Sequence, residues 1–186
     1  MQPKDALELV AMIKTALSHN GPAVIRYPRD PGPAVDFSMD VTPLRVGEAE
    51  IIREPPDGGG TGKLVWIWAL GDMLQLAADT AGLLTAAGVR VGIVNARFIK
   101  PVDADKLRSH ARQAALVVTV ENGALAGGFG SAVRETLAAC GDRCHVVSYG
   151  WDDTFVGQGT TDQLLADAGV TPAKIVEDIL RLLEIS

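Results

Sequence analysis

The sequence predicts an α/β fold in three layers, in which helices cover both faces of a mixed, mostly parallel five-stranded sheet with one antiparallel edge strand. Two observations predict it. Apolar runs such as 64–70 and 115–120 lack polar alternation, which is typical of strands buried on both faces. Segments with helical spacing separate these runs, and such alternation favours parallel pairing. The 186 residues, 47% of them hydrophobic, suit one folded domain with some additional chain.

The first 43 residues are expected to lie outside this sheet. Residues 3–18 carry apolar side chains at near-helical spacing, which predicts an amphipathic helix. This helix should end at residues 19–22, because Gly21 favours a left-handed cap and Pro22 cannot continue the hydrogen bonding. Residues 23–27 are predicted to form a short strand. Residues 31–43 contain Pro and Gly without periodicity, which is typical of a linker.

Residues 44–186 alternate predicted strands and helices. The strands are expected at 47–53, 64–70, 89–94, 115–120 and 144–149. The helices are expected at 71–88, 103–113, 128–139, 162–168 and 172–184, with Asp72 and Asp103 as N-caps. The Gly-rich stretch 54–63 is predicted to turn the first two of these strands into a hairpin, which would supply the antiparallel edge.

Composition and charge exclude several classes of protein. The formal net charge is −6, whereas a nucleic-acid-binding domain needs a surplus of Lys and Arg. Two Cys and three His are too few for a disulfide framework or a four-ligand zinc site. No apolar run approaches the roughly 20 residues of a membrane span, and the N-terminus lacks a signal-peptide pattern. We therefore expect a reducing, cytoplasmic compartment and no nucleic-acid or membrane partner.

The candidate functional segments are those expected at the carboxyl ends of the strands, where ligands of such sheets usually bind. These segments are 26–30, 71–72, 95–101 and 121–130. The three His are scattered, and no nucleophile has an adjacent base, so the residues predict no catalytic group and no metal site in this chain.

Two glycine-rich segments invite comparison with phosphate-binding loops. Residues 57–63 do not fit, because Asp57 stands in place of the first Gly, Leu64 in place of Ser or Thr, and a strand follows where a helix is needed. Residues 127–131 follow a strand and open a helix whose free N–H groups could hold an anion. Close packing of the helix start against the sheet is the favoured interpretation of these glycines.

Arg26 and Arg29 flank the end of the predicted strand 23–27. Pro28 stops strand pairing, which leaves Arg29 on an irregular segment from which it could reach a ligand. Guanidinium groups suit the geometry of phosphate and carboxylate. A surface pair between Arg29 and Asp30 is an equally good interpretation on chemical grounds.

Four motifs in register identify a family resemblance. They are Gly-Pro-Ala-Val-Ile-Arg-Tyr-Pro-Arg at 21–29, Val-Asn-Ala-Arg-Phe-Ile-Lys-Pro-Val-Asp at 94–103, Val-Thr-Val-Glu-Asn at 118–122 and Gly-Gly-Phe-Gly-Ser at 127–131. Together they closely resemble the 1-deoxy-D-xylulose-5-phosphate synthases, which are transketolase-like, thiamine-diphosphate-dependent enzymes. The resemblance implies that residues 1–30 are the last helix and strand of a pyrimidine-binding domain, 31–43 a linker and 44–186 a transketolase C-terminal domain.

The resemblance also implies a role for the two arginines. Arg29 matches the family residue that binds the phosphate of glyceraldehyde 3-phosphate, and Arg26 is expected to give weaker support. The complete enzymes condense pyruvate-derived hydroxyethyl-thiamine with that substrate and release carbon dioxide, using thiamine diphosphate and Mg²⁺. Their product is a precursor of isoprenoids, thiamine and pyridoxal.

The family's catalytic histidines, its thiamine-activating acid and its metal motif lie in domains that precede this region. The resemblance therefore implies that no cofactor binds this chain and that it is inert alone. Its expected partner is the rest of the synthase chain, within an enzyme that forms homodimers.

Two departures from the family pattern stand out. Asn122 follows Glu121 where a second acidic residue is usual, and Trp151-Asp152-Asp153 stands where Leu-Pro-Asp is common. Two alternatives therefore stay open. The chain is either the C-terminal portion of a synthase or a separately encoded, non-catalytic subunit or assembly module of a transketolase-like or 2-oxoacid dehydrogenase-like enzyme. Met1 is correspondingly either a true start or an internal residue.

Overall fold

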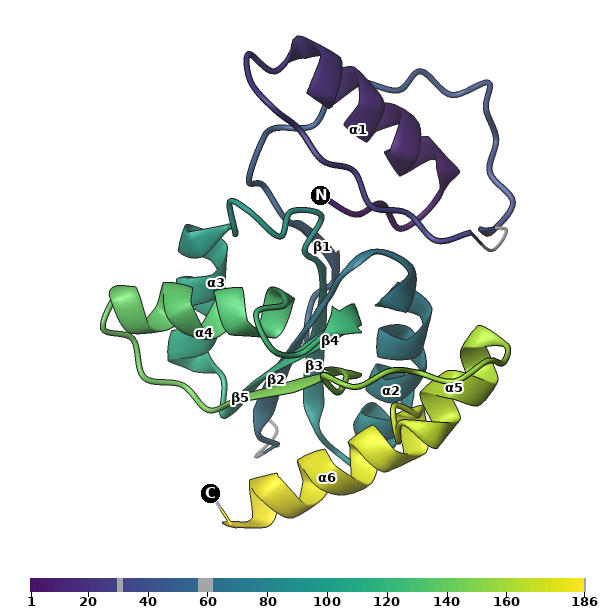
Figure 1. Ribbon diagram of the computed structural model, residues 1–186. Coiled ribbons are helices and arrows are strands. Elements are labelled where there is room, and N and C mark those ends of the chain that lie inside the picture. Colours follow the sequence, from purple (N-terminus) through teal and green to yellow (C-terminus); the bar gives the residue numbers. More distant parts are fainter. Residues whose placement is uncertain (30–31, 57–61, 186) are drawn as a thin grey trace.

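The structure, a computed structural model, describes residues 1–29, 32–56 and 62–185 (Figure 1). Its helices are α1 (Ala6–Ser18), α2 (Leu74–Ala86), α3 (Ala104–Gln113), α4 (Phe129–Ala139), α5 (Thr161–Asp167) and α6 (Pro172–Ile185), and the 3-10 turn η1 (Gly71–Met73) leads into α2. Its strands are β1 (Glu50–Arg53), β2 (Leu64–Ala69), β3 (Arg90–Asn95), β4 (Leu116–Ala124) and β5 (Val146–Trp151). The predicted α/β class and the five-stranded sheet are confirmed.

The strands are ordered β1-β3-β2-β4-β5, and only β1 runs antiparallel to its neighbour. The antiparallel edge is therefore confirmed, but the predicted hairpin between β1 and β2 is wrong, because β1 pairs with β3 and Ile51 faces Val94. The apolar β2 is the central strand, and its two edges are taken by the parallel strands β3 and β4. Residues 57–61 of the predicted turn lie outside the described residues.

The sheet separates two apolar cores, as its continuous apolar strands require. Alternate residues of β2 point to opposite faces: Val65 and Ile67 pack with α2 and α6, and Trp66 and Trp68 pack with α3 and α4. Figure 1 shows these helices on the two sides of the sheet. The helical layers thus cover both faces, as the sequence predicts.

A glycine in β3 makes room for a large indole on the neighbouring strand. Gly92 is the partner of Trp66, and a Cβ at position 92 would lie 2.3 Å from Trp66 Cζ3. The buried Trp66 ring stacks on the His110 ring of α3, with the ring centroids 3.6 Å apart. His110 is only 6% exposed, and its Nδ1 has no hydrogen-bond partner within the described part of the chain. The imidazole therefore serves as a flat core side chain.

The N-terminal segment, residues 1–29 and 32–46, lies over the carboxyl end of the sheet (Figure 1). The predicted helix is confirmed as α1, which begins at Ala6 after its N-cap Asp5. The predicted strand at 23–27 is wrong, because this extended stretch has no neighbouring strand in the described residues. Within the described part of the chain, its backbone hydrogen bonds to other segments are both with Met1: the Met1 amino group donates to the Val24 carbonyl and the Arg26 N–H donates to the Met1 carbonyl, each over 3.0 Å.

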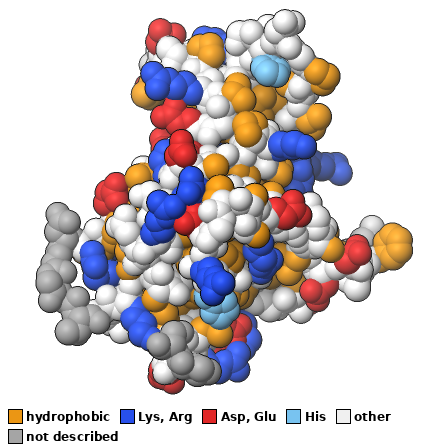
Figure 2. Space-filling model, turned by 90° about the vertical axis from the view of Figure 1, so that its left-hand side faces the viewer, with side chains coloured by type: hydrophobic (Ala, Val, Ile, Leu, Met, Phe, Trp, Pro, Cys, Tyr) orange, Lys and Arg blue, Asp and Glu red, His pale blue; other side chains and the backbone are white. Residues whose placement is uncertain are grey.

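The N-terminal segment exposes several large hydrophobic side chains. These are Ile13, Leu17, Val24, Tyr27, Phe37, Met39 and Val46. Figure 2 shows exposed hydrophobic side chains on the upper part of the molecule, which this segment forms. Such a concentration of apolar surface is typical of a surface that another polypeptide covers.

The two predicted N-caps differ in outcome. Asp103 is confirmed, because its carboxylate accepts the Lys106 N–H over 3.1 Å and also the Ala49 N–H over 2.9 Å. Asp72 is not an N-cap, since α2 begins after Met73 without a side-chain cap. Its carboxylate is instead engaged by side chains from two distant segments, which the next subsection describes.

Candidate functional site

The carboxyl ends of the strands bring most of the predicted segments together. A strand-end network, formed by Arg26, Gln2, Asp72, Asn122 and Trp151, joins the N-terminal segment, η1, β4 and β5. The Arg26 side chain approaches the end of β4, where a Cβ at position 123 would lie 3.2 Å from its Nη1. Three of the four predicted segments thus contribute to one polar network.

Each bond of the strand-end network has a defined donor. The Trp151 indole N–H donates to Asn122 Oδ1, and Asn122 Nδ2 donates to Asp72 Oδ2, both over 2.8 Å. Gln2 Nε2 donates to Asp72 Oδ1 over 2.8 Å, and Arg26 Nη1 donates to Gln2 Oε1 over a longer 3.4 Å. The Asp72 carboxylate is therefore the acceptor at the centre of the network.

Gln2 is the residue of this network that sequence reasoning missed. Its side chain is only 2% exposed, and its backbone N–H donates to the Arg97 carbonyl over 2.8 Å. Gly71 has a φ of +60°, which favours glycine. A Cβ at this position would lie 2.4 Å from Gln2 Cγ, so a larger residue would also collide with the Gln2 side chain. The residues next to Gln2 in the sequence give no indication that its side chain is buried.

The N-terminus of α4 holds an anion that belongs to the protein itself. The Glu121 carboxylate accepts the Phe129 N–H over 2.7 Å and the Gly130 N–H over 2.8 Å. A Cβ at Gly128 would lie 2.4 Å from Glu121 Oε2 and 2.2 Å from the Ala124 carbonyl. The glycines of 127–130 thus permit close packing, and a phosphate would have to displace a buried carboxylate to bind here.

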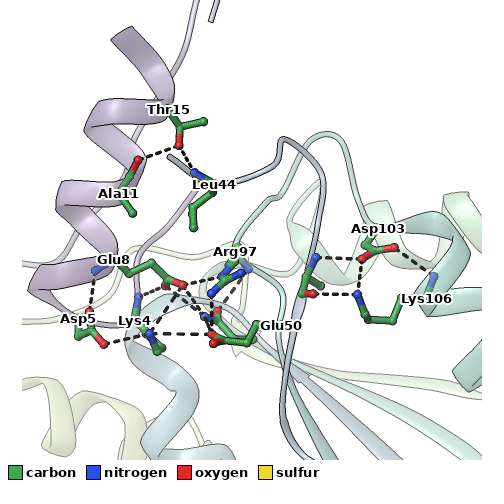
Figure 3. A network of polar contacts seen from close by, with 12 residues as sticks. Lys4, Asp5, Glu8, Ala11, Thr15, Leu44, Glu50, Arg97, Asp103 and Lys106 are labelled. Carbon is green, nitrogen blue, oxygen red and sulfur yellow. Dashed lines mark hydrogen bonds and ion pairs between the residues drawn. The ribbon is translucent and has the colours of Figure 1, made fainter. Parts of the chain in front are cut away.

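A second network fastens α1 to the sheet (Figure 3). This docking network consists of Lys4, Glu8, Glu50, Asn95 and Arg97. The nearly buried Glu8 carboxylate accepts from Arg97 Nε over 2.7 Å and from Asn95 Nδ2 over 2.9 Å, and Arg97 Nη2 lies 2.9 Å from Glu50 Oε2. Segment 95–101 therefore holds the N-terminal segment in place.

Arg97 also has an unusual backbone. Its φ is +57°, a conformation that costs a non-glycine residue about 1–2 kcal/mol. Its side-chain ion pairs with Glu8 and Glu50, and its carbonyl bond to Gln2, offset this cost. The two networks meet here, because Gln2 belongs to one and Arg97 to the other.

The two arginines singled out by the sequence differ in their surroundings. Both are exposed, but Arg26 is tied to Gln2, whereas the Arg29 guanidinium makes no hydrogen bond or ion pair within the described part of the chain. Asp30, the alternative partner of Arg29, lies outside the described residues. Arg26 is thus the arginine that the fold orients toward the strand ends.

A cleft of about 900 Å³ lies between the N-terminal segment, α2 and α5. Its walls are mostly apolar, and Tyr27 and Pro28 line it beside Met73 and Leu74. The charged groups at its walls are Lys4, Asp5, Asp72, Asp79 and Asp162. Four carboxylates against one ammonium group disfavour an anionic ligand, so a phosphate group is not expected inside this cleft.

The two cysteines do not form a metal site with other side chains in the described residues. Cys140 is exposed and Cys144 half-buried, and burial raises the pKa of the Cys144 thiol. In the described ranges, no group of three or more His, Cys, Asp or Glu could hold a metal ion. Among the helices described, none is long and apolar enough to cross a membrane.

Residues 59–175 match the family described as the C-terminal domain of transketolase. The chain belongs to the transketolase C-terminal domain family. It is 42% identical over 183 residues to the 1-deoxy-D-xylulose-5-phosphate synthase of Pelotomaculum thermopropionicum and 40% identical over 175 residues to that of Heliobacterium modesticaldum. These matches cover 97% and 94% of this chain but only 27% and 26% of the relatives. The chain therefore spans about a quarter of the length of these curated relatives.

Solved structures show the same fold. A structure described as a split gene transketolase, inactive beta4 tetramer, superimposes with a TM-score of 0.84 at 32% identity and covers 98% of this chain and 57% of that chain. A Pichia stipitis transketolase, solved with sedoheptulose 7-phosphate, superimposes with a TM-score of 0.64 at 17% identity and is covered over 25% of its length. This second likeness concerns the fold of the transketolase C-terminal domain alone.

Proposed function

We propose that this chain is the C-terminal portion of a 1-deoxy-D-xylulose-5-phosphate synthase. The reaction would join pyruvate and glyceraldehyde 3-phosphate to 1-deoxy-D-xylulose 5-phosphate with loss of carbon dioxide. The observation that carries the proposal is the 40–42% identity to synthases of that name over 94–97% of the chain. The four sequence motifs that gave the family resemblance support the same assignment.

The proposal assigns the carbon chemistry to the rest of the enzyme. Thiamine diphosphate with Mg²⁺ would supply the nucleophilic carbon, held by domains that precede this region. This chain would contribute Arg29 and Arg26 to the phosphate of the acceptor substrate. Both arginines are exposed, and a guanidinium can offer several N–H donors to an anion.

We further propose that residues 1–30 complete the pyrimidine-binding domain of that enzyme. Two observations support this. The stretch 23–27 is extended and strand-like in sequence, yet its backbone partners within the described chain come from Met1 alone. The exposed apolar side chains Ile13, Leu17, Val24 and Tyr27 lie on the same segment. A neighbouring strand from the rest of that domain would pair with the backbone of 23–27, and its apolar surface would cover these exposed side chains.

The decisive experiment assembles the complete enzyme, by which we mean this chain together with the diphosphate- and pyrimidine-binding domains that the proposed reaction requires. We expect the complete enzyme to form 1-deoxy-D-xylulose 5-phosphate and this chain alone to form none. An assembled enzyme that binds thiamine diphosphate but makes no such product from these two substrates would overturn the proposal.

A separately encoded, non-catalytic subunit is the second candidate. The 0.84 TM-score match to a split gene transketolase, which covers 98% of this chain, favours it. The reading frame upstream of Met1 separates the two candidates: an uninterrupted frame supports a portion of one polypeptide, and a stop codon supports a subunit. Isothermal calorimetry with thiamine diphosphate adds a check, because tight binding to this chain alone would contradict both.

A further inference from the structure

The two departures from the family pattern are in contact with each other. Asn122 stands where the resemblance leads one to expect an acid, and Trp151 stands where Leu is common. In the structure the Trp151 indole N–H donates to Asn122 Oδ1 over 2.8 Å. An indole N–H is a donor that a Leu side chain lacks. The departures are therefore two halves of one hydrogen bond between β4 and β5.

The polarity of the whole strand-end network follows from its end groups. An indole N–H and a guanidinium can only donate, and an ionised carboxylate can only accept. Trp151 and Arg26 stand at the two ends and Asp72 stands in the middle. The amides of Asn122 and Gln2 must then each turn the oxygen toward the outer donor and the NH₂ group toward Asp72. One arrangement of donors satisfies every bond.

Arg26 is the exposed end of this network. Its Nη1 donates to Oε1 of the buried Gln2, while Arg26 as a residue is exposed. Gln2 is itself held by Asp72, by the Arg97 carbonyl and by contact with Gly71. A long, flexible side chain at the surface is thus attached to a buried anchor, which lowers the entropy lost when it binds a ligand.

We propose that Gln2, Asp72, Asn122 and Trp151 are positioning residues that orient Arg26 for the phosphate of the acceptor substrate. This inference rests on the proposed function. The network acts through Arg26 and touches neither the substrate nor a cofactor. It explains why Asn122 and Trp151 occur together with Asp72 and Gln2, because each of the four is the donor or acceptor that its neighbour requires.

An acid at position 122 would be incompatible with Asp72. In Asn122→Asp, two carboxylate oxygens would face each other where Asn122 Nδ2 and Asp72 Oδ2 now lie 2.8 Å apart. In Asp72→Asn, the new amide offers one acceptor oxygen to the NH₂ groups of Gln2 and Asn122. One of these two amides must then rotate, and it loses its bond to Arg26 or to Trp151. The double variant Asn122→Asp/Asp72→Asn exchanges the two groups and restores every bond at unchanged net charge.

The experiment measures these variants in the complete enzyme. We expect Asn122→Asp to raise the KM for glyceraldehyde 3-phosphate and the inhibition constant of inorganic phosphate about tenfold, with little change in the pyruvate half-reaction. The double variant should return both to within about threefold of wild type. Asp79→Asn, which neutralises another carboxylate at the wall of the same cleft, should leave them within about twofold.

An Arg26→Ala background tests whether the network acts through that arginine. There, Asn122→Asp should cause no further rise in KM, because the group that it misplaces is absent. An equal rise in both backgrounds, or a double variant that is no better than the worse single variant, would overturn the positioning role. Thermal unfolding of each variant identifies a fold defect: a loss of stability with unchanged KM would also overturn it.

Failure of the inference is distinguishable from failure of the proposed function. A wild-type complete enzyme without synthase activity overturns the proposed function and, with it, the role that depends on it. An active wild type whose KM does not respond to Asn122→Asp overturns only the positioning role.

Discussion

The Glu8 carboxylate on α1 accepts a hydrogen bond from Arg97 Nε over 2.7 Å and thereby joins two segments 89 residues apart in the sequence. Glu8 is almost fully buried, so the pair lies largely out of solvent. The remaining Glu8 oxygen accepts the Lys4 N–H over 2.7 Å. Removing this one carboxylate would leave several donors without an acceptor.

We therefore expect Glu8→Ala to lower the free energy of unfolding by about 3 kcal/mol, because it removes the buried acceptor of Arg97 Nε, Asn95 Nδ2 and the Lys4 N–H. Urea-induced unfolding at neutral pH measures the change. Glu177→Ala is the matched control, since Glu177 belongs to an exposed pair with Lys174 and its loss should change stability by less than about 0.5 kcal/mol. Equal effects of the two variants would contradict the role of the docking network.

The carboxylate of Glu121 should stabilise the start of α4. Glu121→Gln presents an amide NH₂ to one of the two backbone N–H donors, so we expect a loss of about 2 kcal/mol of unfolding free energy. Glu135→Gln, on the exposed side of the same helix, should be nearly neutral. A Glu121→Gln variant as stable as wild type in thermal and urea unfolding would show that this cap is dispensable.

The stability of the protein should decrease on acidification because of His110. Its pKa is lowered to about 4 from 6.5, first by burial and then by the charge of Lys106, while Asp103 opposes the shift. Between these pH values the unfolded chain binds a proton that the folded chain does not. The stabilising contribution is therefore complete above pH 6.5 and is lost as the pH falls toward 4, by at most about 3 kcal/mol.

His110→Phe tests this pH dependence. The variant keeps an aromatic ring against Trp66 but cannot take up a proton. Urea unfolding between pH 7.5 and 4.5 should show a shallower loss of stability for His110→Phe than for wild type. His19→Asn, which removes an exposed histidine, should keep the wild-type slope. An identical slope for His110→Phe would show that His110 is protonated equally in both states.

Arginine substitutions test the phosphate assignment in the complete enzyme. Arg29→Ala should raise the KM for glyceraldehyde 3-phosphate by about tenfold or more and leave the pyruvate half-reaction nearly unchanged. Arg26→Ala should do the same if its orientation by Gln2 serves substrate binding. Arg45→Ala, in an exposed ion pair with Glu48, is the control. An unchanged KM in either arginine variant removes that residue from the assignment.

The local patterns were reliable where burial alone governs the outcome. Continuous apolar runs predicted β2 and β4, and these strands are buried on both faces over most of their length. Asp103 was predicted as an N-cap and is one, because a cap requires only the backbone of its own helix. Such features depend on neighbours within a few residues.

The wrong predictions concern features that depend on partners distant in the sequence. The turn signal before β2 suggested a hairpin, but pairing with β3 and β4 places β2 in the centre of the sheet. Asp72 resembled a cap in sequence, but Gln2 and Asn122 bind its carboxylate from other segments. Residues 23–27 have the composition of a strand, and composition cannot supply the partner that a strand needs.

The amino-acid order alone was sufficient for the α/β class, the mixed sheet and the family, because apolar periodicity and short motifs are local properties. Only the folded chain revealed that Asn122 bonds to Trp151, that Gln2 anchors Arg26 and that Glu121 fills the anion site of α4. These contacts join residues that are separated along the chain, and they form only when the sheet brings its strand ends together. Tertiary packing therefore decided how the candidate site is built.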